Sequence, residues 1–362
     1  MTEMVSDAGN KRPLVYGVDT LRIVAAIWVA CGHGAFLNVK ALLGTHFGAL
    51  SALFGVLFSG SAAVVIFFII SGFCIHYPNI NKASLDWKTF LVRRAARIGI
   101  PLLAIVLITR LLGNEYVESE NAVLWSLYCE IIYYALYPIL FIIERNYKIK
   151  IGHVLWLSVF ISVAMLLTRA EYMRLWEFGY TLTWLFCAPA WLLGACLAEY
   201  FTPNSRRLLP GSLWYWRLCM IGLGSLSTLL LFHTPAQLHF TIGVPWTIIP
   251  IVGLAYFWVH DELLSFRLTV LTAKFETLGR ASYSLYLIHK IGITALSPMA
   301  AHMNALVFWL IELFSIAAAS AAFYFAVERP SHIVAKRVKI GKSRRKSESH
   351  SAAEQKQRTE RP

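Results

Sequence analysis

Long apolar stretches separated by short polar segments run through almost the whole chain. Ten of them approach the roughly 20 residues that an α-helix needs to cross a bilayer. The pattern therefore predicts an all-α polytopic integral membrane protein with about ten transmembrane helices. The residues between the eighth and ninth stretches, 260–278, alternate apolar and charged positions, which indicates a loop or a helix lying at the membrane interface. The ten predicted spans lie near residues 16–36, 51–77, 98–113, 122–143, 152–168, 180–200, 213–232, 241–259, 280–298 and 305–327.

Composition excludes a soluble protein. Of the 362 residues, 57% are hydrophobic and only 15% are charged, whereas a soluble domain carries about 25% charged residues. The net charge of +13 would suit a nucleic-acid partner, but its placement follows membrane topology instead. With the N-terminus inside and before the C-terminal tail is counted, the inner segments hold 16 Lys and Arg and the outer loops hold 5. This positive-inside bias predicts cytoplasmic N- and C-termini and no nucleic-acid partner.

The spans divide the chain into three parts. We expect a cytoplasmic N-terminal tail at 1–15, a transmembrane domain at 16–330, and a basic, disordered cytoplasmic tail at 331–362 that touches anionic lipid. No additional soluble domain is expected. The first span is expected to be retained rather than cleaved as a signal peptide, because charged residues interrupt it and no A-x-A-like site follows. The six cysteines form no C-x-x-C pair, so no metal site is predicted.

The first span carries three residues that lipid does not favour: Asp19, Arg22 and His33. Arg22 and His33 are eleven positions apart, which places them on one helix face and about 16 Å apart along the axis. Asp19 is three positions before Arg22 and can pair with it. Charged residues inside spans usually face a bundle interior or a wet cavity. A histidine hydrogen-bonded between helices is the plainer interpretation of His33 alone, and the arginine on the same face argues against it.

Three arginines, Arg93, Arg94 and Arg97, precede the third span. They suit an ordinary positive-inside anchor. They also suit an anion site, because guanidinium groups bind phosphates in a bidentate manner. The predicted topology puts them on the cytoplasmic side, where nucleotide-bearing cofactors are found.

Glu130 lies about eight residues inside the fourth span, where an unpaired carboxylate is costly. Tyr134 and Tyr137 follow on the same predicted face. Glu130 and His33 have similar predicted depth, so we expect the two to pair, with the carboxylate orienting the imidazole. A purely structural contact between helices is the alternative.

The ninth span is rich in polar groups, with Ser282, Tyr283, Ser284, Tyr286 and His289. Contact with substrate and hydrogen bonding between helices explain them equally well. Glu328, in the segment VERP that closes the last span, is expected to cap or pair at the inner interface.

Taken in order, these segments resemble the membrane acyltransferase family 3, which includes bacterial polysaccharide and lipopolysaccharide O-acetyltransferases and the nodulation-factor acetyltransferases. The resemblance covers Tyr16 to Pro330. This chain has VDTLRI where the family often has LDGLRG, so Thr20 and Ile23 replace two glycines. The segments that carry the resemblance are GVDTLRIVAAIWVACGH, FFIISGF at 67–73, RRAARIGIP, WSLYCEIIYY and SYSLYLIH.

The resemblance implies an O-acetyltransferase of the bacterial inner membrane that moves an acyl group, acetyl by expectation, from cytoplasmic acyl-CoA to a hydroxyl of a glycan or glycolipid. Acyl-CoA acts as a donor substrate, and no bound cofactor is expected. His33 and Glu130 would be catalytic, and Arg22, Arg93, Arg94 and Arg97 would bind acyl-CoA. A covalent acyl-enzyme stays open, with Ser126 and the tyrosines as possible carriers. Substrate-binding or supporting roles fall to Asp19, Ser71, Gly72, Trp125, Ser126, Tyr134, Tyr283, Tyr286 and His289.

Two other functions use the same residues. An exporter of a lipid or glycan would use the buried charges as a pathway, but it needs no cytoplasmic arginine cluster. A non-catalytic membrane scaffold leaves Arg22, His33 and Glu130 without a purpose. The acceptor, the length of the acyl group and the oligomeric state are not determined by the sequence.

Overall fold

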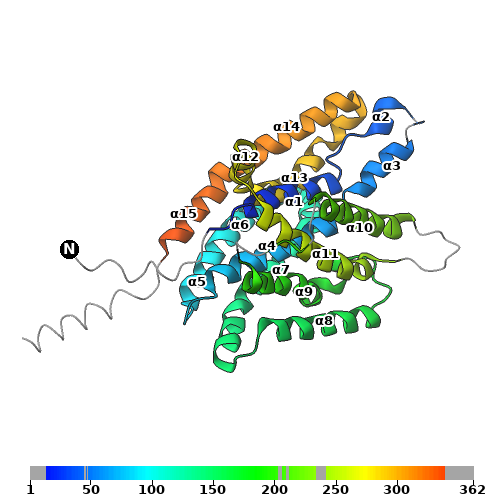
Figure 1. The fold of residues 1–362 in the computed structure, drawn as a ribbon. Helices are drawn as coiled ribbons and strands as arrows, with labels where there is room; N and C mark the ends of the chain where they lie inside the picture. The colour runs from blue at the N-terminus through cyan, green and yellow to red at the C-terminus, as the bar shows by residue number, and fades with distance from the viewer. Residues whose placement is uncertain are drawn as a thin grey trace, which may run out of the picture.

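The computed structural model describes residues 14–44, 46, 48–202, 206–208, 212–233 and 242–338. In these ranges all regular structure is helical (Figure 1). The principal helices are α1 (Val18–Gly32), α2 (Val39–Leu43), α3 (Gly48–Leu57), α4 (Gly60–His76), α5 (Trp87–Arg94), α6 (Ile100–Leu112), α7 (Asn114–Tyr147), α8 (Ile151–Thr168), α9 (Gly179–Tyr200), α10 (Trp214–His233), α11 (Val244–Ser265), α12 (Val270–Gly279), α13 (Ser282–Leu296), α14 (Ala305–Phe323) and α15 (Arg329–Arg337).

Short turns of other helix types join or extend these elements. Two of them are π-helical, and both interrupt a longer helical run. The turns are η2 (Tyr77–Asn79), η3 (Ala95–Gly99), η4 (Leu175–Phe178), η6 (Ser297–His302) and η7 (Tyr324–Glu328).

Eight helical runs in the described residues are long and apolar enough to cross a membrane, and each coincides with a predicted span. The chain is therefore an all-α polytopic membrane protein. The other two predicted spans, the first and the ninth, are α1 and α13. Each is an α-helix of 15 residues, shorter than a usual span.

Helix α4 is the central helix of the bundle and packs against α1, α9 and α11 (Figure 1). Its crossing with α9 is close because both helices place a glycine there. A Cβ on Gly72 would collide with the carbonyl of Trp191, and one on Gly194 would collide with the carbonyl of Ile69. The two backbones approach this closely only because neither glycine has a side chain.

Helix α1 packs against α4, α12 and α13. The segment 260–278, expected as a loop or interfacial helix, divides between the last turns of α11 and the separate helix α12. Helix α12 starts with a capping box formed by Thr269 and Thr272. Its C-terminal Gly279 lies directly against the backbone of Asp19, which fixes the first turn of α1.

The two π-helical turns lie together at one end of the molecule. Helices α5, η3 and α6 form one run from Trp87 to Leu112, and α14, η7 and α15 form another from Ala305 to Arg337. Helix α15 packs against η3 and α5, at the end opposite α2 and α3 (Figure 1). We call this the arginine end, because Arg94 and Arg97 lie there.

The expected tail boundary at residue 331 is wrong for its first residues. Residues 331–337 belong to α15, and Ser331 and Ala335 are buried. They are ordered because α15 has an apolar side that packs on η3. Residues 339–362, like residues 1–13 of the expected N-terminal tail, lie outside the described part of the chain.

Candidate active site

The ion pair predicted on α1 is confirmed. Arg22 Nη1 lies 3.1 Å from Asp19 Oδ1. The pair sits in the first two turns of α1, and the side chains are 23% and 34% exposed. Arg22 also interacts electrostatically with Tyr134 and Glu130 on α7. The Arg22 side chain therefore links α1 to Glu130 and Tyr134 on α7, the fourth predicted span.

His33 ends α1 and contacts α13. It is the C-cap residue of the helix, and its Nδ1 lies 2.9 Å from Nε2 of His289. The two rings are stacked, with centroids 5.1 Å apart and an angle of 24° between their planes. His289 is fully buried, whereas His33 is partly exposed. The pair thus has one imidazole, His33, that is open to the outside of the bundle, and a second, buried imidazole that is hydrogen-bonded to it.

The hydrogen bonds assign the tautomers of this pair. His289 Nδ1 lies 3.2 Å from the carbonyl oxygen of Leu285, which can only accept. His289 Nδ1 therefore carries the proton, and its Nε2 accepts. The donor in the bond between the rings is then Nδ1–H of His33. This leaves the lone pair of neutral His33 on Nε2, while the ring also contacts the backbone of Val29, one turn earlier on α1.

The predicted contact between His33 and Glu130 is not formed. Glu130 accepts hydrogen bonds from Ser71, at 2.6 Å, and from Tyr134. Ser71 also lies 3.0 Å from the Tyr134 hydroxyl and accepts a bond of 3.2 Å from Trp191 Nε1. Equal predicted depth in the membrane did not mean contact, because Glu130 bonds to α4 and to its own helix while His33 bonds to His289 on α13. The interaction of Tyr137 also differs, since it reaches His76 rather than Glu130.

Three of the four predicted donor-binding arginines come together. Arg97 lies within electrostatic range of both Arg22 and Arg94. The Arg94 guanidinium is 5.6 Å from the ring of Phe90 and 5.6 Å from the ring of Tyr134. We call Arg22, Arg94 and Arg97 the arginine cluster. Three guanidinium groups repel one another, so an anion held between them is stabilised.

Arg93 lies outside this cluster. Its Nε donates to the carbonyl of Val338 at 3.0 Å in an exposed position. It is close to Lys82, a residue between two spans, where burial and the charge of Arg93 lower the pKa of the ammonium group. The helical geometry explains the separation, since Arg93 and Arg94 point about 100° apart around α5.

The two π-helical turns shape the arginine cluster. Arg97 belongs to η3 and Glu328 to η7. Glu328 accepts two bonds from Ser284, at 3.0 Å from the amide nitrogen and 2.5 Å from the hydroxyl, and it interacts electrostatically with Arg97 and Arg22. The Ser331 hydroxyl donates to the Arg97 carbonyl at 3.4 Å. Single π-helical turns are frequent at functional sites, which agrees with a binding role for this end.

The tyrosines of α13 form hydrogen bonds with residues of α7 and η3. Tyr286 lies 2.6 Å from the Ser126 hydroxyl and donates to the Val123 carbonyl at 3.1 Å, and its ring is 5.9 Å from that of His289. Tyr283 donates to the carbonyl of Ile98 in η3 at 3.2 Å. Helix α13 therefore connects the histidine pair to α7 and to the arginine end.

Two remaining site predictions have packing roles in the structure. The Trp125 ring packs 6.5 Å from Phe68 and 6.4 Å from Trp176. Gly72 forms the close crossing of α4 and α9. Trp191 was not predicted, although it contacts Ser71 directly, because a tryptophan in an apolar stretch gives no polar signal.

The fold and site define a class: a polytopic helical membrane protein with a histidine pair inside the bundle and an arginine cluster at one end. The sequence model of the acyltransferase domain of the acyltransferase 3 family matches residues 15–327. The chain belongs to this family of membrane acyltransferases. No curated protein and no solved structure matches the chain.

Proposed function

We propose that this acyltransferase moves an acetyl group from acetyl-CoA to a hydroxyl of a glycan or glycolipid at the membrane. Family membership gives acyl transfer. The proposal adds the donor, the acceptor class and the side on which each binds. The observation that carries it is the histidine pair, whose hydrogen bonds leave the lone pair of the partly exposed His33 on Nε2.

His33 is the general base in this proposal. Its Nε2 accepts the proton of the acceptor hydroxyl while the hydroxyl oxygen attacks the thioester carbonyl. The carbon–sulfur bond then breaks, the acetyl group stays on the acceptor oxygen, and the CoA thiolate takes the proton back from His33. General-base assistance of this kind is typically worth about 10²- to 10⁴-fold in rate.

Direct transfer fits the surroundings of the nearby hydroxyls. Ser126, the serine considered as an acyl carrier, bonds to Tyr286 and to the Val123 carbonyl. No histidine bonds to Ser126 among the described residues. A serine nucleophile needs an adjacent base, so the structure favours the acceptor hydroxyl over Ser126 as the attacking group.

The arginine cluster binds the phosphates of the donor in this proposal. Guanidinium groups hold phosphate in charge-assisted pairs, and CoA carries several phosphate charges. The excess of Lys and Arg on the same side of the membrane favours a cytoplasmic location for this end, with both termini cytoplasmic and the chain in the bacterial inner membrane. Arg93, which lies outside the cluster, has no part in donor binding.

Glu130 has a supporting role rather than the catalytic role expected from sequence. It accepts hydrogen bonds from Ser71 and Tyr134 and interacts electrostatically with Arg22. Its charge offsets part of the repulsion in the arginine cluster. Glu130 thereby keeps Arg22 in place between the donor phosphates and the histidine pair.

Transfer of labelled acetyl groups in membranes tests this proposal. Membranes containing the protein are incubated with labelled acetyl-CoA, and the glycans and glycolipids are extracted and counted. We expect His33→Ala to lower turnover by about 10²- to 10⁴-fold with normal insertion. His153→Ala, which removes an exposed histidine of α8, is the matched control. Full transfer by His33→Ala would refute the assignment of the base, and an absence of label in the glycans and glycolipids of wild-type membranes would refute the donor.

A further inference from the structure

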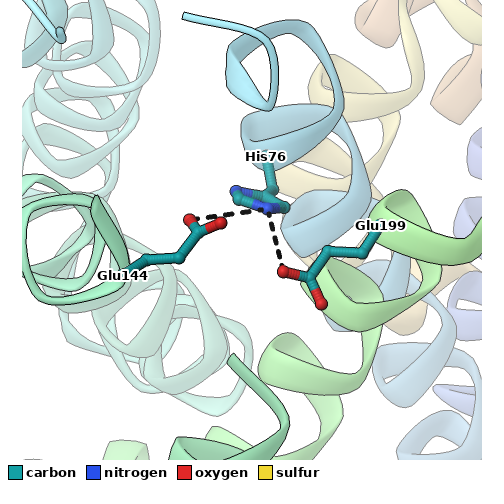
Figure 2. Close-up of side chains that lie close together, drawn as sticks. All are labelled: His76, Glu144 and Glu199. Carbon is teal, nitrogen blue, oxygen red and sulfur yellow. Dashed lines mark ion pairs between the residues drawn. The ribbon is translucent and has the colours of Figure 1, made fainter. Parts of the chain in front are cut away.

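Three helices bring a histidine and two glutamates together at a place the acyl-transfer site does not use. His76 ends α4, Glu144 lies near the end of α7, and Glu199 lies near the end of α9. His76 Nε2 is 4.0 Å from Glu144 Oε2 and 3.9 Å from Glu199 Oε1. Figure 2 shows the two carboxylates approaching the imidazole from separate helices. One potential ligand atom from each residue lies within 4.8 Å of the others.

The histidine is oriented by a second contact. Its Nδ1 lies 3.1 Å from the Tyr137 hydroxyl, and its ring is fully buried. When Nδ1–H donates to the tyrosine oxygen, Nε2 presents a lone pair to the carboxylates. Metal-binding histidines commonly have this arrangement, in which the nitrogen that does not bind the metal donates to a neighbouring oxygen and fixes the ring.

The carboxylates are largely withdrawn from water. The side chains of Glu144 and Glu199 are only 16% and 21% exposed, and Glu144 Oε2 is buried without a hydrogen bond. Arg145 and Lys150 act on them electrostatically, but neither forms an ion pair with them within the described residues. Arg145 instead donates to the Ile80 carbonyl and lies over the ring of Phe141. A positive charge between two buried carboxylates and an imidazole lone pair would stabilise this arrangement.

We propose that His76, Glu144 and Glu199 bind a divalent first-row metal ion, for which zinc is the probe. One imidazole and two carboxylates form a nitrogen–oxygen set that suits zinc, manganese or ferrous iron. Ligand atoms about 2.1 Å from a tetrahedral zinc lie about 3.4 Å apart. The observed separations of 3.9 and 4.0 Å need to close by about half an ångström, which rotation of the two flexible glutamates provides.

The position of the three ligands gives the metal a structural purpose. The same helices carry the cluster around Glu130: Ser71 on α4, Tyr134 on α7 and Trp191 on α9. His76 lies five residues after Ser71 on α4. A metal ion would therefore hold the ends of α4, α7 and α9 at a fixed spacing, a few turns from the residues that position Arg22.

An ion triad without metal is the competing arrangement. A protonated His76 would pair with both glutamates at the observed distances. The two arrangements differ in a measurable way, because only a metal site takes up zinc stoichiometrically and is stripped by a chelator.

Metal content and thermal stability of the untagged, detergent-purified protein test the proposal. We expect about one zinc per chain after dialysis against zinc, a fall in Tm with EDTA, and recovery of Tm with rising zinc concentration, since ligands that bind only the folded state stabilise it. His76→Gln and Glu199→Gln should each weaken zinc binding at least tenfold. Glu171→Gln, in an exposed glutamate that pairs with Arg169, is the matched control and should bind zinc like the wild type.

The outcomes separate the two arrangements. Absence of stoichiometric zinc in the wild type, or equal zinc binding in His76→Gln and Glu199→Gln, overturns the proposal and leaves the ion triad. If either variant fails to fold, X-ray absorption at the zinc edge of the wild type decides instead, because one imidazole with oxygen ligands is expected. Ligands without imidazole would overturn the site. Acetyl transfer by His33 stands in either case, since the two sites share no ligand.

Discussion

The support that His289 gives to His33 leads to a quantitative prediction. His289→Ala removes the acceptor of the His33 Nδ1–H bond, which is 2.9 Å long. A buried donor left without a partner costs about 1–3 kcal/mol. If that cost falls on the reacting arrangement of His33, it corresponds to about a 5- to 150-fold loss in rate, because 1.36 kcal/mol is a tenfold change. The loss should be smaller than for His33→Ala, because the base itself remains.

The assay separates positioning from binding. Purified protein in nanodiscs is given labelled acetyl-CoA and a glycolipid extract, and kcat and KM for acetyl-CoA are measured. We expect His289→Ala to lower kcat and leave KM for acetyl-CoA unchanged, because the arginine cluster is intact. His289→Gln has similar length, and its amide oxygen can accept from His33, so it should recover most of the rate.

Folding needs its own control, because His289 is fully buried and truncation leaves a cavity. The Tm of each variant shows whether the protein is still folded at the assay temperature. A wild-type kcat in folded His289→Ala would refute the support role. So would a His289→Gln variant that is folded but as slow as His289→Ala.

Two further predictions follow from neighbouring residues with different surroundings. Arg94→Ala should raise KM for acetyl-CoA about tenfold or more, since a charge-assisted hydrogen bond is worth about 1.5–3 kcal/mol. Arg93→Ala should leave this KM unchanged. Equal KM values for the two variants would refute donor binding by the arginine cluster. Gly194→Ala places a methyl group against the Ile69 carbonyl and should lower Tm and the yield of inserted protein. Gly222→Ala meets no atom within 4 Å and should keep or raise Tm, so a harmless Gly194→Ala would contradict the close crossing.

The course of the helices could be predicted because lipid imposes a strong and simple pattern. Apolar length located every long helix that the structure describes. The pair of Asp19 and Arg22 was predictable for the same reason, since both lie on one helix and the spacing alone brings them together. Contacts within one helix need no knowledge of the tertiary fold.

The partners of His33 and Glu130 required the tertiary fold. Depth in the membrane says how far along the bundle axis a residue lies, but not which neighbouring helix it faces. His33 meets α13 and Glu130 meets α4, so residues of similar predicted depth have different partners. The separation of Arg93 from Arg97, four positions later, also depends on the π-helical turn η3, and no residue type in that segment predicts such a turn.

Helices α1 and α13 have a consequence for the membrane itself. Helix α1 has 15 residues and extends about 22 Å, and the α-helical part of α13 has the same length before η6 continues it, whereas the hydrocarbon core of a bilayer is about 30 Å thick. A bilayer meets such a hydrophobic mismatch by local thinning or by admitting polar groups at the helix ends. The two histidines, His33 and His289, are carried by these two helices, so the acyl transfer proposed above would take place beside this mismatch.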